Sequence, residues 1–138
     1  MLVQLAVASG MVFVTVLLHG TGIAALARKL QFDLTGEEHH HHFTLGIAIK
    51  VLSVVFGLFA LHGVEIWLYA GLYLSLDAVA NLETAVYFST ITYAAIGYDD
   101  SAMATQWRLV SAIEGVNGLL LLGWSTAFFV TVVARLRR

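Results

Sequence analysis

Apolar residues form three long runs in this chain. Residues 2–27 carry no charge, residues 51–76 carry one histidine and a single charged residue, Glu65, and residues 109–134 carry only Glu114. A helix that crosses a bilayer needs about 20 apolar residues, so each run is long enough to do so. The pattern therefore predicts an all-α membrane protein with three transmembrane helices.

A fourth apolar segment, residues 82–95, is too short to span a bilayer. Membranes tolerate such a segment as a re-entrant helix when it is buried in protein. Asn81 is suited to cap its first turn, which also contains Glu83. We expect this helix to enter from the outer surface, so that its C-terminal end points toward the middle of the membrane and favours a cation there.

Composition narrows the class of protein. The chain has 138 residues, of which 59% are hydrophobic and 12% are charged, as expected for one domain surrounded by lipid. It contains no cysteine, which excludes disulfides and thiolate metal sites. Neither a nucleophile–base pair nor a phosphate-binding loop is evident, so we expect no enzyme, no cofactor and no nucleic-acid partner.

The basic residues predict an orientation in the membrane. Six of them fall on one side of the expected arrangement: Arg28, Lys29, Lys50, Arg135, Arg137 and Arg138. Only Arg108 lies at the other end. Because cytoplasmic loops carry an excess of basic residues, we expect a multi-pass protein of the cell membrane with its N-terminus outside and its C-terminus in the cytoplasm.

Residues 92–100 read Thr-Tyr-Ala-Ala-Ile-Gly-Tyr-Asp-Asp and separate the short helix from the last apolar run. This stretch resembles the selectivity filter of the potassium channel family, Thr-x-x-Thr-Val-Gly-Tyr-Gly-Asp. The resemblance extends from about residue 50 to residue 138 and leaves the first helix as an addition. It implies a homotetramer, because a carbonyl ring needs four strands, with monovalent cations passing the backbone carbonyls of Ile96, Gly97 and Tyr98.

The match is imperfect at two positions. Thr92 takes the place of the first family threonine and Asp100 that of the final aspartate, but Ala95 replaces the second threonine and Asp99 replaces the outer glycine. Two interpretations follow. Either the outer acids concentrate cations above a working potassium filter, or the outer sites are distorted and sodium or divalent cations also pass. A non-conducting membrane scaffold or sensor with the same fold is the alternative function.

The resemblance divides the chain into an N-terminal peripheral transmembrane helix (1–30), a cytoplasmic His-rich loop (31–43) and a pore domain (44–138). In the pore domain we expect an outer helix (44–77), a pore helix (82–94), the filter (95–100) and an inner helix (107–135). On the inner helix, Gly118 matches a hinge glycine, and three residues are expected to line the cavity: Leu119, Leu122 and Thr126.

Two acids lie inside the membrane, where a charge is costly. Glu114 shares one helical face with Ser111, Gly118 and Ser125, which predicts packing against another helix. Glu65 and Glu114 either fix the outer helices to the re-entrant helix through hydrogen bonds, or form a contact behind the filter that depends on their protonation. In the second case, replacing Glu114 by glutamine should shift the pH dependence of the current.

Histidines occur in two settings. His39, His40, His41 and His42 follow two glutamates and are expected to form a solvated loop, with a regulatory zinc or nickel site or a pH site as the alternative. His19 and His62 lie in the apolar runs with no evident partner, and we assign them no role.

Overall fold

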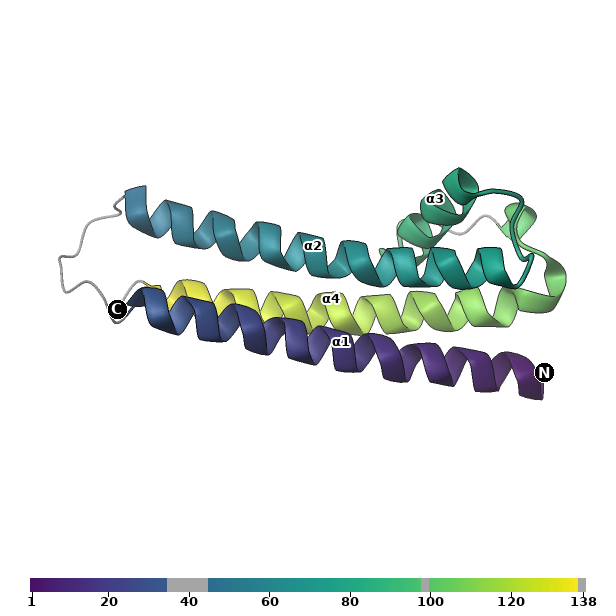
Figure 1. Cartoon of the computed structure of the whole chain (residues 1–138), viewed down its shortest axis with the longest axis horizontal. Coiled ribbons are helices and arrows are strands. Elements are labelled where there is room, and N and C mark those ends of the chain that lie inside the picture. The colour runs from purple at the N-terminus through teal and green to yellow at the C-terminus, as the bar shows by residue number, and fades with distance from the viewer. Residues whose placement is uncertain (35–44, 98–99, 137–138) are drawn as a thin grey trace.

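The structure is a computed structural model that describes residues 1–34, 45–97 and 100–136. Its helices are, in chain order, α1 (Leu2–Leu34), α2 (Leu45–Ser75), α3 (Leu82–Tyr93), the 3-10 turns η1 (Asp100–Ala102) and η2 (Thr105–Trp107), and α4 (Arg108–Leu136). The three long helices lie side by side, α1 and α4 in one direction and α2 in the other (Figure 1). The described residues contain no strand.

Each of the three long helices is long and apolar enough to cross a membrane. The candidate spans are Leu2–Leu30, Leu45–Ser75 and Thr105–Leu136. Their outer faces carry large apolar side chains such as Phe13, which is 66% exposed, and Phe59, which is 77% exposed. Such a surface suits lipid and not water. The predicted all-α membrane fold with three transmembrane helices is therefore confirmed.

Helix α3 lies beside α2 and α4 at the end of the bundle where α1 begins (Figure 1). The side chain of Asn81 accepts a hydrogen bond from the backbone N–H of Thr84 at 2.9 Å, and Glu83 lies in the first turn. The expected N-cap is therefore confirmed. The cap satisfies a backbone donor that would otherwise lack a partner, which fixes where this short helix starts.

The C-terminal end of α3 is closed by a tight turn. The N–H of Ala95 donates to the carbonyl of Thr92, and the N–H of Ile96 donates to the carbonyl of Ile91, each at 3.0 Å. This is the hydrogen-bond pattern of a Schellman motif, which places a residue in the left-handed region. That residue is Ala95, with φ of 52°. Alanine has a Cβ that disfavours this region, so packing must hold the turn.

Two apolar clusters hold the bundle together. The first surrounds α3 and includes the fully buried side chains of Tyr73, Phe88 and Val110. The second lies toward the opposite end and consists of Ile23, Leu30, Val54, Leu58 and Val132. Beside the first cluster, Gly118 of α4 touches the end of α3 so closely that an added Cβ would lie 2.2 Å from the carbonyl oxygen of Tyr93. A side chain at this position would separate the two helices.

Candidate functional site

The first residues of the motif surround a hollow at the C-terminal end of α3. The hollow has a volume of about 280 Å³ and is lined by Thr92, Ala95, Gly97, Ser111, Ala112 and Gly115. Thr92 is buried, and its hydroxyl has no hydrogen-bond partner among the described residues. Ile96 is 76% exposed on the single chain. The structure thus brings Thr92, Ala95 and Gly97 together where α3 meets α4.

Other residues of the predicted filter and loop lie outside the described part of the chain. Tyr98, Asp99 and residues 39–42 fall in the undescribed segments, so their predicted roles stay predictions. Asp100 begins η1, but its side chain is not described.

Of the residues predicted to line a cavity, Leu119 and Thr126 lie on an exposed part of α4, whereas Leu122 packs against the first apolar cluster. Leu119 is 61% exposed, Thr126 is exposed, and Leu122 is partly buried. The hydroxyl of Thr126 donates to the carbonyl of Leu122 at 2.8 Å, a bond within the helix. Gly118, the predicted hinge, is buried on another face, and α4 is helical on both sides of it. Its contact with Tyr93 gives Gly118 a packing role, while the hinge stays a prediction.

Glu114 connects three helices. Its carboxylate is fully buried and accepts hydrogen bonds from the hydroxyl of Tyr73 on α2 and from that of Ser89 on α3, the latter at 2.5 Å. Ser89 also lies 3.1 Å from the backbone carbonyl of Ile66, to which it can donate instead. The arrangement matches the first of the two interpretations of the buried acids, in which hydrogen bonds pin the outer helix to the re-entrant helix.

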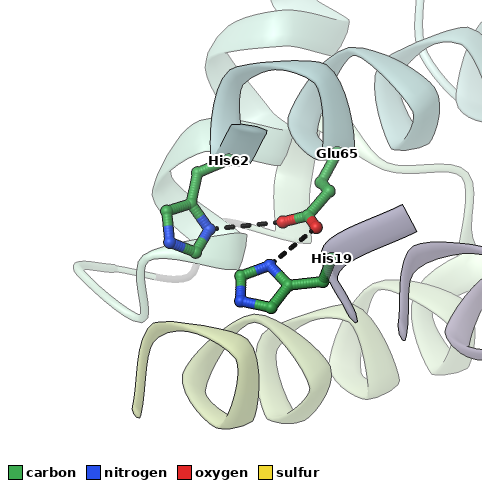
Figure 2. A group of neighbouring side chains, drawn as sticks. All are labelled: His19, His62 and Glu65. Atoms are coloured by element: carbon green, nitrogen blue, oxygen red, sulfur yellow. Dashed lines mark hydrogen bonds and ion pairs between the residues drawn. The ribbon is translucent and has the colours of Figure 1, made fainter. Parts of the chain in front are cut away.

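Glu65 has a different set of partners. The Nδ1 atom of His19 lies 2.9 Å from its Oε1, and the Nδ1 atom of His62 lies 3.2 Å from its Oε2. Figure 2 shows the two imidazole rings reaching the carboxylate from α1 and from α2. The hydroxyl of Tyr93, the last residue of α3, also donates to Oε2. Glu65 therefore connects α1 and α2 to the end of α3.

Ser125 of α4 closes this set into a ring. Its Oγ lies 3.2 Å from Nε2 of His19 and 2.9 Å from Nε2 of His62. The side chains of Glu65 and His19 are fully buried, and that of His62 is 13% exposed. We call the set of Glu65, His19, Ser125, His62 and Tyr93 the Glu65 ring. It joins α1, α2, α3 and α4 near the middle of the bundle.

The Glu65 ring corrects the interpretation of two histidines. The sequence showed no evident partner for His19 or His62, whereas the structure gives both of them a partner in Glu65. His62 lies three residues before Glu65, on the same face of a helix, so the sequence held a signal for this pair. The partner of His19 depends on how α1 docks, which no local pattern specifies.

A second buried contact also joins α1 to α2 and α4, and the sequence did not predict it. Asn117 of α4 donates from Nδ2 to the hydroxyl oxygen of Thr15 on α1 at 2.8 Å and to that of Tyr69 on α2 at 3.2 Å. All three side chains are buried. The added N-terminal helix is thus fixed to α4 and α2 by polar contacts as well as by apolar packing.

The Glu65 ring contains three side chains of the types that bind metal ions. His19, His62 and Glu65 are the one group of three metal-type donors in the described part of the chain, with ligand atoms within 4.8 Å of one another. Each of these atoms is already in hydrogen-bond contact with a neighbouring side chain. The geometry is that of a closed hydrogen-bond ring, and we assign no metal to it.

Comparison with known proteins identifies the family. Residues 61–135 match a family model described as an ion channel. No curated protein and no solved structure matches the chain. The matched segment begins within α2, includes α3 and the motif after it, and ends in α4, so α1 lies outside it. The chain belongs to this ion channel family, and its resemblance to the potassium-channel-like pore family is confirmed.

Proposed function

We propose that four copies of the chain form a cation channel in which potassium passes the backbone carbonyls of Ile96, Gly97 and Tyr98. One observation carries this proposal: α3 does not span the membrane and ends with Tyr93 against Gly118, and the motif follows directly. The C-terminal end of a helix carries partial negative charge, which favours a cation beside it. Helix α3 therefore both positions the motif and attracts the ion.

The apolar surface of the single chain supports assembly. On α4, Val116, Leu119 and Leu120 are each more than 60% exposed, and Ile96 is exposed beside the hollow. A carbonyl ring needs four equivalent strands, and one chain supplies one. Packing of four α4 helices around an axis covers part of this surface and encloses the cavity that Leu119, Leu122 and Thr126 are proposed to line.

The two departures from the family motif set the proposed selectivity. Ala95 has no hydroxyl to complete the innermost ion site, so binding there is weakened. Asp99 and Asp100 surround the outer mouth with carboxylates, which attract cations and bind divalent ions well. We therefore propose a potassium-conducting channel with reduced selectivity, in which sodium and calcium compete for the outer sites.

The proposed orientation rests on the basic residues. Arg28, Lys29, Lys50 and Arg135 lie at the end of the bundle remote from α3 (Figure 1). The excess of basic residues in cytoplasmic loops supports an orientation with this end inside the cell and α3 at the outer surface. The N-terminus is then outside and the His-rich segment is cytoplasmic.

Flux measurements on the purified protein in liposomes test the proposal. Potassium-driven flux that empty vesicles lack is expected, with reversal potentials that rank potassium above sodium and calcium. Silence across pH and voltage would favour a non-conducting scaffold. Gly97→Ala should abolish flux, whereas Gly10→Ala on α1 should not. An added Cβ meets no atom within 4 Å at either glycine in the single chain, so the pair separates a filter effect from misfolding.

A further inference from the structure

When Glu65 is ionised and both histidines are neutral, the Glu65 ring has more hydrogen-bond contacts than hydrogens to fill them. Five contacts of hydrogen-bond length must each contain a hydrogen: Glu65–His19, His19–Ser125, Ser125–His62, His62–Glu65 and Tyr93–Glu65. A sixth contact, His62–Tyr93 at 2.9 Å, can share the hydrogen of one of the last two. With an ionised Glu65 and two neutral imidazoles, each hydroxyl and each imidazole supplies one hydrogen, which makes four. One contact is then left without a hydrogen, so the lone pairs of two acceptor atoms face each other.

No choice of tautomer removes this shortage. If both imidazoles donate to Glu65 from Nδ1, both Nε2 atoms need the single hydrogen of Ser125. If His62 donates to Ser125 instead, its Nδ1 lone pair faces the carboxylate of Glu65. The hydroxyl of Tyr93 lies 2.9 Å from that nitrogen, but it can donate its single hydrogen only to the nitrogen or to the carboxylate, and not to both. An unsatisfied buried polar contact is costly, so the ring is incomplete in this protonation state.

One additional proton completes the ring. It makes either one imidazolium beside the carboxylate or one carboxylic acid between two neutral imidazoles, and in both cases every contact contains a hydrogen. The ring then also has no net charge, which is the least costly state within the membrane. We propose that the Glu65 ring is a binding site for one exchangeable proton, and that release of this proton loosens the end of α3.

Titratable groups approach the ring from every helix packed around it. These are His19 from α1, His62 and Tyr69 from α2, Tyr93 from α3 and Glu114 from α4. Glu114 is the other carboxylate in contact with α3, and its own titration must be separated from that of the ring.

The position of the ring gives the proton a consequence for the pore. Tyr93 ends α3, and Ala95, Ile96 and Gly97 follow it. Glu65 accepts from the hydroxyl of Tyr93 and is itself contacted by His19, while Gly118 packs against the Tyr93 backbone, so the added helix α1 contributes to positioning the motif. We expect the current to fall as the pH rises and the ring opens. This effect on current rests on the proposed function, whereas proton binding does not.

Glu65→Gln separates proton binding from structure. The amide group can donate to Nδ1 of His19 and accept from His62 and Tyr93, so the ring is complete with two neutral imidazoles at every pH. The matched control is Glu83→Gln, because Glu83 is exposed in the first turn of α3. All variants are compared in the Glu114→Gln background as well as in the native chain, so that Glu114 contributes no proton.

Two readouts are independent of conduction. In detergent, the unfolding equilibrium of the Glu114→Gln protein should shift by up to tenfold per pH unit above about pH 6.5, with stability lost as the pH rises, because the folded ring there keeps one proton while the two histidines of the unfolded chain lose theirs. The double variant with Glu65→Gln should lack this loss of stability at high pH, and the Glu83→Gln control should keep it. The imidazole nitrogen resonances of His19 and His62 should change over the same range only when Glu65 is present.

The outcomes decide the proposal. Equal pH dependence with and without Glu65, or histidine resonances that do not respond to pH, would overturn it. Chelator-reversible stabilisation by Zn²⁺ that replaces the pH dependence would identify a metal site and overturn it as well. If Glu65→Gln does not fold, Ser125→Ala serves instead. It removes two contacts and with them the need for the extra proton, so the pH dependence should move to lower pH, whereas Ser53→Ala on exposed α2 surface should leave it unchanged.

The readouts also separate this proposal from the proposed function. If stability depends on the proton but no ion flux is measured, the proton-site proposal is supported and the channel proposal is contradicted. If ion flux is measured but neither stability nor the histidine resonances depend on the proton, the channel proposal is supported and the proton-site proposal is contradicted.

Discussion

Glu65 and Glu114 are both fully buried carboxylates that accept a tyrosine hydroxyl and contact α3, yet they differ in their remaining partners. Those of Glu65 are two imidazoles, and that of Glu114 is the hydroxyl of Ser89. As a neutral acid, Glu114 can donate to Ser89, whose own hydroxyl then turns to the carbonyl of Ile66. Its hydrogen bonds are therefore complete with or without a proton.

The contrast teaches that a carboxylate's partners decide whether a proton affects structure. Hydroxyl groups can rotate and act as donors or acceptors, so the contacts around Glu114 persist in either protonation state. An imidazole must exchange a proton to make the same change. Glu114 is thus suited to a permanent connection at the middle of α3, and Glu65 to a proton-dependent one at its end.

Truncating each carboxylate is the strongest way to break the comparison. Glu65→Ala leaves two imidazoles and a hydroxyl without their acceptor, so we expect a loss of about 3–5 kcal/mol of unfolding free energy. Glu114→Ala leaves two hydroxyls, of which Ser89 has another acceptor, and should cost about 1–3 kcal/mol. Denaturant titration of the purified protein in detergent measures both. Equal losses, or a larger loss for Glu114→Ala, would contradict the distinction.

Gly118→Ala should disturb the contact between Tyr93 and Glu65 and leave the contacts of Glu114 in place. The new Cβ would lie 2.2 Å from the carbonyl oxygen of Tyr93, so α3 must move away from α4 at a cost of about 1–3 kcal/mol. The displacement should weaken the contact of Tyr93 with Glu65 and reduce the pH dependence of stability. Gly123→Ala on the same helix meets no atom within 4 Å and should be neutral or slightly stabilising. Identical behaviour of the two variants would refute the close contact.

The sequence predicted what depends on local pattern. Three spans, the short helix with its Asn81 cap, and one polar face on α4 follow from the spacing of apolar and polar residues along each helix. The pairing of His19 with Glu65 could not be predicted, because it depends on how far α1 is shifted and rotated against α2. A helix turns through about 100° per residue, so a shift of one residue brings a different side chain to the contact.

Asn117 was missed for the same reason as His19, since Thr15 and Tyr69 become its partners only when α1 and α2 dock on α4. The proposed filter presents another limit. A carbonyl ring needs four copies of the chain, and Tyr98 and Asp99 lie outside the described residues, so their roles stay predictions from the motif alone. Local sequence pattern thus predicts which polar side chains lie inside the membrane, and the packing of the helices determines their hydrogen-bond partners.

Glu114→Gln sharpens the comparison with a smaller effect. The amide can donate to Ser89 and accept from Tyr73, which reproduces the contacts of the neutral acid. We expect a change in unfolding free energy of at most about 1 kcal/mol. The part of the pH dependence that belongs to the Glu65 ring should remain, both in stability and in current. A loss as large as that of Glu114→Ala would mean that the carboxylate charge itself holds α3.

Thr92→Val tests a hydroxyl on α3 that, unlike those of Ser89 and Tyr93, does not donate a hydrogen bond to a carboxylate. The Thr92 hydroxyl is buried without a hydrogen-bond partner among the described residues, so replacing it by a methyl group should leave stability unchanged or raise it by up to about 1 kcal/mol. Ser89→Ala, one turn earlier, removes a donor to Glu114 and should be destabilising. If Thr92→Val is instead as costly as Ser89→Ala in the assembled protein, then another copy of the chain supplies the partner of Thr92 at the hollow. Flux measured on the same variant would then reveal whether that contact also positions the filter.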